Sequence, residues 1–355
     1  MTRIYLLLII IVYLPARGQN NPESILLKNY RPVNIYQTSV TLPQKSSFAV
    51  IDMHTHPYAK SEEDLDKWIK IMGETGLKKS IVMTYAHGTR FDSLVNAYAK
   101  YNEYFDLWCG IDYSRYEQPD FAEHAIRELK RCFQNGATGV GELGDKGKGL
   151  FYCKPPAWGM HSDDPRMIPV FSACAELNMP VNIHVADPKW MYEKMDETND
   201  GLMNAYKWRL DNQSDIKGHG DMIRILENTV KQNPNTTFIA CHLANCTYDL
   251  SLIGRLLENY PNLYIDIGAR YAELAPIPRT ARNFFITYQD RIVYGTDMGF
   301  DKSMYQLTFR ILETSDEHFY DFDRSSYHWA LNGLDLSEEV LEKVYYKNAE
   351  KIIGR

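Results

Sequence analysis

The chain has 355 residues, a length typical of a single α/β barrel, and its 45% hydrophobic residues are enough for one large core. Charged residues make up 24% of the chain, and the formal net charge is −7. This acidic balance argues against a nucleic-acid-binding surface, which needs clustered lysine and arginine side chains.

The N-terminus has the pattern of a secretory signal peptide. Arg3 provides a positive charge, residues 4–14 form an unbroken apolar run, and Ala16 and Gly18 supply small residues for a cleavage site. The run is shorter than the roughly 20 residues that span a bilayer as a helix, although an uncleaved anchor is the alternative. We expect residues 1–18 to be removed and the protein to be exported to the periplasm or the extracellular space, without membrane attachment after cleavage.

Residues 19–47 are polar and contain three prolines without a sustained period, so they predict an N-terminal arm that packs on the body. The spacing of the six cysteines matches neither a zinc site nor a disulfide-built scaffold. Most are expected to be buried thiols, and an oxidised pair is an alternative that the sequence leaves open. These cysteines are Cys109, Cys132, Cys153, Cys174, Cys241 and Cys246.

After the arm, short apolar runs alternate with amphipathic segments. The runs are rich in valine, isoleucine and aromatic residues and cover residues 48–56, 80–85, 107–113, 138–143, 180–186, 237–243, 263–269 and 291–297. The amphipathic segments cover residues 62–74, 91–104, 120–134, 166–177, 221–232, 250–258 and 280–288. Strands that alternate with helices predict βαβ units and a parallel sheet. Eight such strands predict a single (β/α)8 TIM barrel, an α/β fold, over residues 48–355.

A last helix is expected after Ser337, a typical N-cap residue, and before Gly354. Three connections are longer than the usual length of about 4–6 residues. They cover residues 144–165, 187–220 and 298–336, the last with a helix around residues 305–312. Each follows a strand, so each is expected at the C-terminal face of the barrel, where barrel enzymes keep their active sites.

Side chains suited to metal binding end several of the predicted strands. His54 and His56 end the first strand, and the period of two places both on one face together with Asp52. The polar residue that ends each of several later strands has, taken alone, a structural explanation. Together, several unpaired polar groups on one rim of the barrel would be costly to desolvate without an ion. We therefore predict a metal centre. The later strands end in Glu142, His184, His242 and Asp297.

The order His-x-His, Glu, His, His, Asp along successive strands resembles the amidohydrolase superfamily. The segments Val-Asn-Ile-His-Val-Ala-Asp-Pro, Cys-His-Leu-Ala, Pro-Asn-Leu-Tyr-Ile-Asp-Ile and Tyr-Gly-Thr-Asp resemble its amidohydrolase-2 branch, which contains relatives of aminocarboxymuconate-semialdehyde decarboxylase and lactone hydrolases. The resemblance covers residues 48–355. It implies one divalent ion, most often zinc, held by His54, His56, His184 and Asp297. In two-metal members a fourth-strand carboxylate bridges the ions, so Glu142 leaves a second ion open.

The resemblance also implies that His242 stands beside the metal as a polarising or proton-transferring group. A metal lowers the pKa of bound water to about 7, which would give hydroxide at neutral pH. Asp297 would then take the proton and deliver it to the leaving group, while His242 would stabilise the developing oxyanion. Asp52 has two equal interpretations, a partner that fixes the tautomer of a ligand histidine or a polar contact in the barrel floor.

Candidate substrate-binding residues follow other strands. Arg270 offers a bidentate fork for a carboxylate, with a surface ion pair as the alternative. Trp158, Trp190, Tyr85 and Tyr58 could stack on a ring or sugar face or serve as lid packing. Lys146, Lys148 and Lys189 are similarly placed, although such lysines are usually solvated.

The favoured function is therefore an exported hydrolase that opens an ester, lactone or amide in a small, anionic or carbohydrate-derived molecule. The main alternative is non-oxidative decarboxylation of a small carboxylic acid. A TatD-like nuclease is a third hypothesis, because Gly-Glu-Leu-Gly resembles that family's fourth strand, and the acidic charge counts against it. A barrel that binds metal without turnover is the fourth. The sequence indicates no oligomeric state.

Overall fold

The computed structural model describes residues 21–324 and 326–354. The predicted signal peptide, residues 1–18, lies outside the described residues, and export stays a prediction. None of the helices in the described part of the chain has the length and apolar character needed to cross a membrane.

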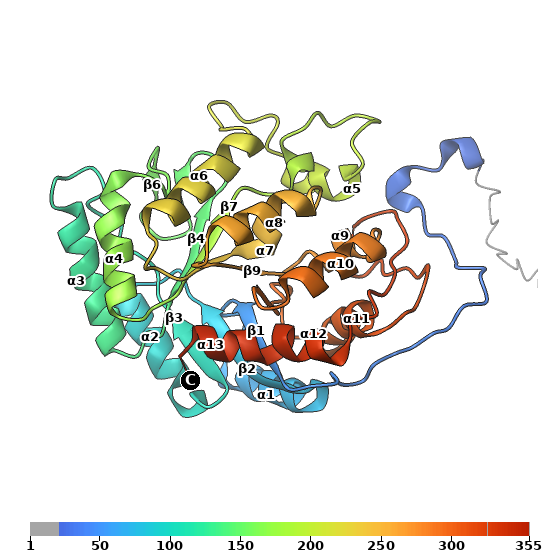
Figure 1. The fold of residues 1–355 in the computed structure, drawn as a ribbon, viewed down its shortest axis with the longest axis horizontal. Helices are drawn as coiled ribbons and strands as arrows, with labels where there is room; N and C mark the ends of the chain where they lie inside the picture. Colours follow the sequence, from blue (N-terminus) through green and yellow to red (C-terminus); the bar gives the residue numbers. More distant parts are fainter. Residues whose placement is uncertain (1–20, 325, 355) are drawn as a thin grey trace, which may run out of the picture.

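The predicted alternation of strands and helices is present, and every one of the eight predicted barrel strands forms (Figure 1). Neighbouring strands pair in parallel in two sheets, with the orders β1-β2-β3 and β10-β9-β8-β7-β4. The barrel strands are β1 (Val50–Thr55), β2 (Leu77–Met83), β3 (Phe105–Trp108), β4 (Val140–Asp145), β7 (Val181–Val185), β8 (Phe238–Ala240), β9 (Leu263–Asp266) and β10 (Ile292–Val293).

Backbone contacts join the two sheets at both seams. A parallel bridge between Cys109 and Val140 connects β3 to β4. At the other seam the Met53 amide of β1 donates to the Tyr294 carbonyl after β10 at 2.9 Å, and the Asp297 amide donates to the His54 carbonyl at 2.9 Å. The strands therefore form the predicted (β/α)8 barrel.

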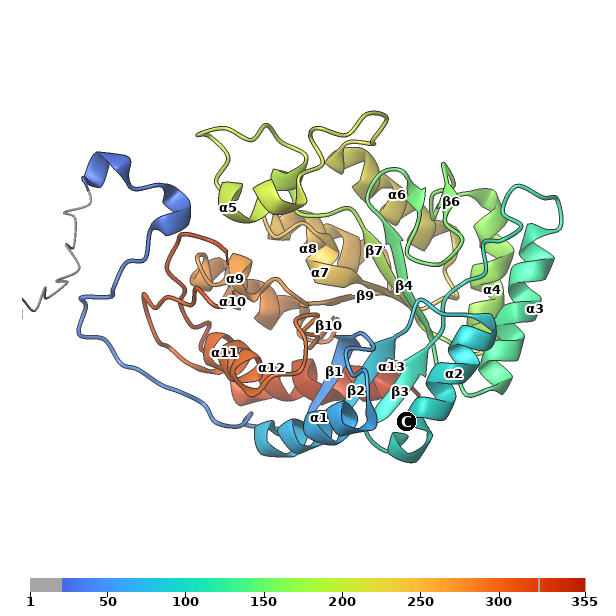
Figure 2. The same cartoon turned by 180° about the vertical axis from the view of Figure 1, so that it is seen from behind.

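Amphipathic helices cover the outside of the barrel (Figure 2). In α3, for example, Phe121, Ala125, Leu129 and Cys132 are buried at helical spacing. The longer helices are α1 (Glu62–Thr75), α2 (Gly88–Tyr98), α3 (Phe121–Gln134), α4 (Ile168–Glu176), α6 (His219–Gln232), α8 (Leu250–Asn259), α10 (Pro278–Tyr288) and α11 (Lys302–Glu313). The single-turn segments are α5 (Leu202–Ala205), α7 (Cys241–Ala244) and α9 (Tyr271–Leu274), and the 3₁₀ turns are η1 (Pro22–Ser24), η2 (Leu27–Asn29), η3 (Ala99–Tyr101), η4 (Pro165–Met167), η5 (Lys189–Met191) and η6 (Tyr206–Trp208).

The last helix is interrupted where it meets the barrel. It consists of α12 (Glu338–Glu342), a π-helical turn η7 (Lys343–Lys347) and α13 (Asn348–Ile352). Because the Val344 carbonyl accepts a hydrogen bond from the Tyr294 amide at 2.9 Å, it is drawn out of the regular helical ladder. Ser337 occupies the predicted N-cap position, but its side chain makes no capping hydrogen bond.

Apolar side chains from six of the barrel strands, β1, β2, β3, β8, β9 and β10, fill part of the barrel interior and pack against α13. This packing leaves the polar residues at the strand ends as the lining of the opposite, C-terminal face. The cluster contains Ile51, Met53, Ile81, Met83, Trp108, Ile239, Tyr264, Val293 and Ala349.

The three long connections rise from the C-terminal ends of the strands, as predicted. The first carries a hairpin of β5 (Gly149–Leu150) and β6 (Ala157–Trp158), the second carries η5, α5 and η6, and the third carries α11. The N-terminal arm runs along the outside near α11 (Figure 1). It is held there by contacts such as the Thr41 amide on Asp316 Oδ2, at 2.7 Å, and the Ser47 hydroxyl on Glu313 Oε2, at 2.5 Å.

Candidate metal centre

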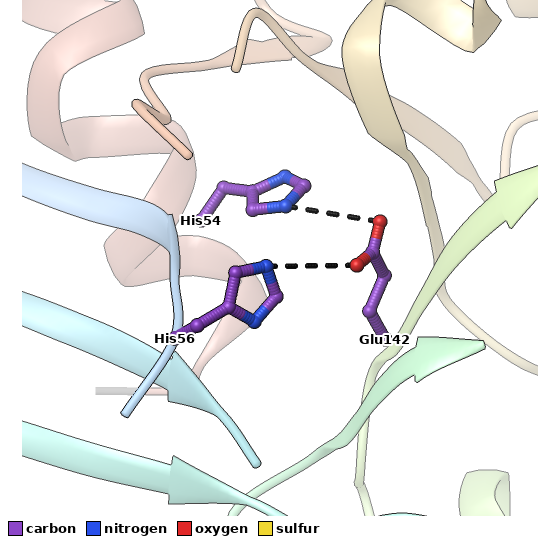
Figure 3. A group of neighbouring side chains, drawn as sticks. All are labelled: His54, His56 and Glu142. Atoms are coloured by element: carbon purple, nitrogen blue, oxygen red, sulfur yellow. Dashed lines mark ion pairs between the residues drawn. The ribbon is translucent and has the colours of Figure 1, made fainter. Parts of the chain in front are cut away.

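His54 and His56 aim their rings at the side chain of Glu142 across the mouth of the barrel (Figure 3). His54 Nε2 lies 3.8 Å from Glu142 Oε1, and His56 Nε2 lies 3.6 Å from Glu142 Oε2. The alternation of β1 causes this convergence, because the intervening Thr55 hydroxyl faces away and donates to the Ile81 carbonyl at 2.7 Å. A Cβ atom at Gly295 would come within 2.7 Å of the His54 Cβ, so a glycine makes room for this ring.

Three histidines are fixed so that Nε2 faces the centre. The Nδ1 atoms of His56 and His242 lie 3.0 Å and 2.8 Å from the carbonyls of Met83 and Gly268. A carbonyl only accepts, so the proton of each neutral ring is on Nδ1 and the lone pair is on Nε2. His54 has the same arrangement, with Nδ1 on a carboxylate. These three Nε2 atoms are the ones that would bind a metal ion.

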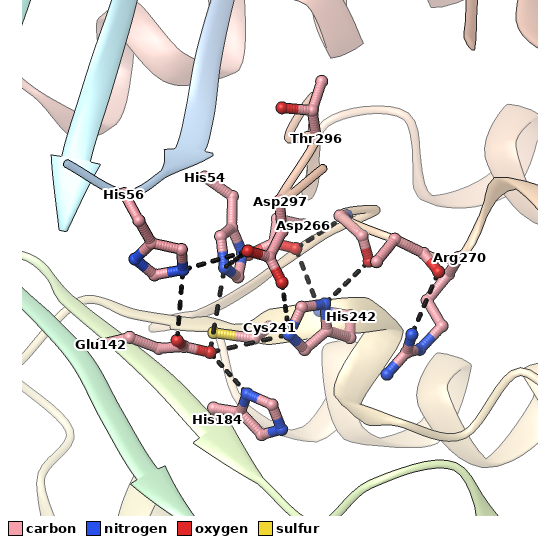
Figure 4. A network of polar contacts seen from close by, with 12 residues as sticks. His54, His56, Glu142, His184, Cys241, His242, Asp266, Arg270, Thr296 and Asp297 are labelled. Atoms are coloured by element: carbon pink, nitrogen blue, oxygen red, sulfur yellow. Dashed lines mark hydrogen bonds and ion pairs between the residues drawn. The ribbon is translucent and has the colours of Figure 1, made fainter. Parts of the chain in front are cut away.

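Asp297 closes the group from the end of the eighth strand. Its Oδ1 lies 3.1 Å from His56 Nε2 and 3.8 Å from His54 Nε2, and its Oδ2 lies 3.7 Å from His242 Nε2 (Figure 4). The Tyr58 hydroxyl donates to Oδ1 at 3.1 Å. Asp297 is the most exposed member of the group, since a quarter of its side chain is accessible. It therefore meets both the centre and a molecule that enters from the solvent.

His184 joins the group on the opposite side of Glu142. Its Nδ1 lies 2.5 Å from Glu142 Oε1, and its Nε2 lies 3.1 Å from Asp187 Oδ1. Asp187 in turn pairs with Lys146 at 2.7 Å. Burial opposes a charge on this ring, but both nitrogens face carboxylates, which outweigh burial and raise the pKa of His184. A metal ion would take the place of the proton on Nδ1, while Asp187 would keep the proton on Nε2.

The charges of the group are those of a site built for a cation. Burial disfavours charge on His54, but nearby Asp266 and Asp297 outweigh it and raise the pKa of this ring to about 10. Burial also opposes ionisation of Glu142 and Asp297, yet the neighbouring histidines hold the pKa of both carboxyl groups below the usual range. In the free site protonated histidine rings compensate these carboxylates, and a bound cation could take over that role.

His242 differs in its protonation. Burial, together with the charge of Arg270, lowers the pKa of His242 to about 4, so the ring is neutral at pH 7. A neutral ring whose Nδ1 proton is on the Gly268 carbonyl has no proton on Nε2. In this state His242 is a metal ligand or a proton acceptor, and the predicted stabilisation of an oxyanion would require the protonated ring. That role stays a prediction.

Asp266 is a residue of the site that the sequence analysis missed. Its Oδ2 accepts from His54 Nδ1 at 2.8 Å and from Asn182 Nδ2 at 3.2 Å, and its Oδ1 accepts from the amides of His242 and Gly268 at 2.9 Å each. Asp266 is completely buried. The available signal was an acidic residue at the end of an otherwise apolar strand, Leu-Tyr-Ile-Asp-Ile.

Asp52 has the second of its two predicted roles, as a polar contact in the barrel. Its Oδ1 accepts from the amides of His54 and Thr296 at 3.1 and 3.0 Å, and its Oδ2 accepts from the Thr296 hydroxyl at 2.6 Å. The tautomer of His54 is fixed by Asp266 instead. Burial raises the pKa of Asp52 to about 7, although these hydrogen bonds oppose the shift.

A cavity of about 470 Å³ opens directly onto the centre. Arg270 lines it and is 7% exposed, so the predicted alternative of a surface ion pair is wrong. Its guanidinium donates to Asn245 Oδ1 at 2.6 Å, and its Nε lies 3.6 Å from Glu273 Oε1. These contacts hold the guanidinium group of Arg270 at the wall of the cavity. The lining also includes Lys146, Tyr152, His184, Asp187, Trp208, His242, Asp297, Arg324 and Tyr327.

The predicted aromatic residues lie in three different places. Tyr85 is part of the centre, because its hydroxyl lies 2.9 Å from His56 Nε2 and donates to Glu142 Oε2 at 3.0 Å. Trp190 lies in the second long connection, where its ring packs edge-on at 6.2 Å from that of Tyr327, and it does not line the cavity. Trp158 is 53% exposed and lines a neighbouring cavity.

The residues fit a divalent metal. His54 Nε2 is buried and has no hydrogen-bond partner within the described structure, which is costly for a polar atom unless an ion binds it. Mixed histidine and carboxylate ligands suit zinc, manganese and similar ions. Buried residues that can share an ion form three overlapping groups: His54, His56 and Glu142; Glu142, His184 and His242; and His54, His242 and Asp266.

The family model described as amidohydrolase matches residues 51–355. The chain matches no curated protein.

Similar solved structures have the same fold. An uncharacterized TIM-barrel protein from Bordetella bronchiseptica has a TM-score of 0.54 at 14% identity, with 87% of this chain and 100% of that chain covered. A dihydroxybenzoic acid decarboxylase from Polaromonas, with bound manganese and 2-nitroresorcinol, has a TM-score of 0.53 at 14% identity, with 86% of this chain and 97% of that chain covered. A 5-carboxyvanillate decarboxylase from Novosphingobium aromaticivorans, complexed with manganese and 4-hydroxy-3-methoxy-5-nitrobenzoic acid, has a TM-score of 0.53 at 15% identity, with 89% of this chain and 100% of that chain covered.

Proposed function

The chain belongs to the amidohydrolase family, and from that premise we propose that it is a metal-dependent, non-oxidative decarboxylase of a small carboxylic acid. In this reaction the bond between the carboxylate carbon and its neighbour breaks, carbon dioxide leaves, and a proton takes its place. One observation carries the proposal. Arg270 and Asp297 line the same cavity, so a cation that can grip an acid and a carboxyl group that can carry a proton face one bound molecule.

A divalent ion would be held by His54, His56, His184 and Asp297, and when bound it would polarise the oxygen atoms of the substrate. The predicted zinc is one choice. Manganese is the other, because it suits carboxylate ligands and is present in two of the similar structures. Glu142 lies between the histidines of the first strand and His184, where it could bridge a second ion.

Asp297 must gain a proton before it can give one, because its carboxyl group is ionised in the free site. A hydroxyl group beside the carboxylate of the substrate would supply that proton, and Asp297 would then deliver it to the carbon that loses carbon dioxide. Two similar structures, under 25% identical to this chain, are decarboxylases named for hydroxylated aromatic acids. We therefore propose a small hydroxy acid, with an aromatic ring as the first choice.

The proposal is tested by measuring carbon dioxide release from a panel of hydroxybenzoates and aliphatic hydroxy acids. The purified protein is loaded with zinc or with manganese, and His54→Ala protein serves as the control. We expect one member of the panel to give carbon dioxide and the corresponding decarboxylated product in equal amounts. The absence of release from every acid, together with hydrolysis of an ester or lactone, would contradict it.

Hydrolysis of an ester, lactone or amide is the second candidate. The family description favours it, and an ionised Asp297 can accept a proton from an attacking water molecule. The same preparations are tested with lactones, esters and amides by titrating the acid released. Acid release that requires the metal and Asp297, without carbon dioxide, would assign this function.

Arg270→Gln is expected to raise KM for the acid substrate by about 10- to 100-fold, because a hydrogen bond to a charged group contributes about 1.5–3 kcal/mol. Arg270→Lys keeps the charge but loses the fork, and we expect an intermediate KM. Arg282→Gln, which removes an exposed partner of Asp335, is the matched control and should leave KM unchanged. Equal KM values in the parent enzyme and the Arg270→Gln variant would contradict the role of Arg270 as the substrate grip.

A further inference from the structure

We infer, on the premise of the proposed function, that the substrate extends beyond the metal centre and carries a second anionic group on a ring, which binds in an adjoining cavity formed by Lys148, Lys207 and Trp158. This cavity has a volume of about 410 Å³. It shares Lys146, Asp187 and Trp208 with the cavity at the metal centre. The two cavities therefore adjoin, and an elongated ligand would reach from one into the other.

The adjoining cavity carries positive charge that no described residue nearby cancels. Lys146 is paired with Asp187 at 2.7 Å, and Arg209, another lining residue, is paired with Asp211 at 2.6 Å. In contrast, Lys148 makes no ion pair with any of the described residues. The last lining cation is Lys207, whose ammonium group donates, among the described residues, only to the uncharged hydroxyl group of Ser326, at 2.8 Å. Two ammonium groups thus favour an anionic ligand.

Aromatic surface lies beside these ammonium groups. Trp158 is 53% exposed and Trp208 is 61% exposed. The Phe151 ring stacks nearly parallel to Trp158, with an interplanar angle of 8° and a centroid distance of 6.0 Å, and supports it from one side. Large aromatic side chains that stay exposed around a cavity provide flat faces for a planar ring or a sugar ring.

The part of the cavity that presents Lys148 is preformed. Buried Asp145 accepts hydrogen bonds from the amides of Gly147 and Gly149 at 2.9 and 3.1 Å, on either side of this lysine. The Gly147 carbonyl accepts from the Lys217 amide at 3.0 Å, which ties this loop to the next long connection. Gly147 has a φ of 119°, where a Cβ atom would come within 2.6 Å of the Ile216 side chain. A loop that is already fixed by hydrogen bonds loses less conformational entropy when a ligand binds to it.

The occupant is therefore a ring that bears a carboxylate, and the ring is either aromatic or a sugar. Benzoate and D-glucuronate represent these two sources, and neutral benzamide tests the need for charge. Binding of each to the metal-loaded protein is followed by quenching of tryptophan fluorescence. The background is Arg270→Gln, because this substitution weakens capture of a carboxylate at the metal centre.

In this background, Lys148→Glu is expected to weaken binding of benzoate or glucuronate by about tenfold, since it replaces attraction with repulsion. Trp158→Phe should remove most of the quenching. The matched control is Lys130→Glu, on the exposed side of α3. Benzoate binding alone would assign an aromatic ring, and glucuronate binding alone a sugar. Binding by neither, or equal affinities in the Lys148→Glu and Lys130→Glu variants, would overturn the inference.

Kinetics separate this inference from the proposed function. Among acids that the enzyme decarboxylates, those with a second, distal carboxylate should have a higher kcat/KM, and Lys148→Glu should reduce that preference about tenfold. Decarboxylation without such a preference would overturn the inference and leave the function standing. Binding of the probes without any carbon dioxide release would contradict the function and leave the anion-binding cavity standing.

Discussion

Asp297→Asn is expected to lower kcat by about 10²–10⁴-fold, the usual contribution of a positioned acid or base. The amide keeps an oxygen that can accept the Tyr58 hydroxyl, so the local packing should persist. It cannot take up and release a proton. The loss should therefore occur in both candidate reactions, since each requires this group to carry a proton.

The measurement is kcat at saturating metal, together with the metal content of the variant, because Asp297 is also a predicted ligand. Asp290→Asn is the matched control, since that carboxylate is 68% exposed and pairs only with Lys343 among the described residues. A kcat of Asp297→Asn near that of the parent, with metal bound in both, would contradict the proton-carrying role.

Asp266→Asn is expected to lower the affinity of the protein for its metal ion about 10- to 100-fold relative to the parent. The amide oxygen can still accept from the backbone amides of His242 and Gly268. The amide nitrogen, however, would face His54 Nδ1, and two donors cannot pair. His54 would then shift its proton to Nε2, where the metal should bind.

This substitution should also destabilise the fold, by about 3–5 kcal/mol, because it breaks a buried charged pair. Asp52→Asn is the matched control. It is equally buried, but its Oδ2 partner is the Thr296 hydroxyl, which can turn to accept a hydrogen bond from the amide. Thermal unfolding and elemental analysis of both variants give the comparison. Similar metal content and stability in the two would contradict the assignment of Asp266 to the support of His54.

The barrel and the identity of the converging side chains could be predicted because both depend on local patterns. Short apolar runs between amphipathic segments predicted the strands, and polar residues at the ends of several strands mark the C-terminal face. For that reason His54, Glu142 and Asp297 were found although they are far apart in the chain. In the structure, His54 Nε2 indeed lies 3.8 Å from both Glu142 Oε1 and Asp297 Oδ1.

Contacts between strands could not be predicted, because no local pattern specifies which neighbour a side chain meets. His54 and its partner Asp266 are separated by 212 positions, and Asp52 is a nearer candidate by sequence. The burial of loop residues could not be predicted from the sequence either. Arg270 at a loop start could have been a surface cation, and only the fold around it, with Asn245 and Glu273 as partners, makes it part of a cavity wall.

The proposed metal centre is tested most directly by elemental mass spectrometry of the purified protein. The parent, His54→Ala and His124→Ala are compared after each has been shown to fold by circular dichroism, and His124 serves as the control because its ring pairs with Asp112 outside the centre. We predict about one divalent ion per chain in the parent and the control and loss of that ion in His54→Ala, while a second ion would make Glu142 a bridging ligand. A folded parent that binds no divalent ion after incubation with zinc or manganese would contradict the account.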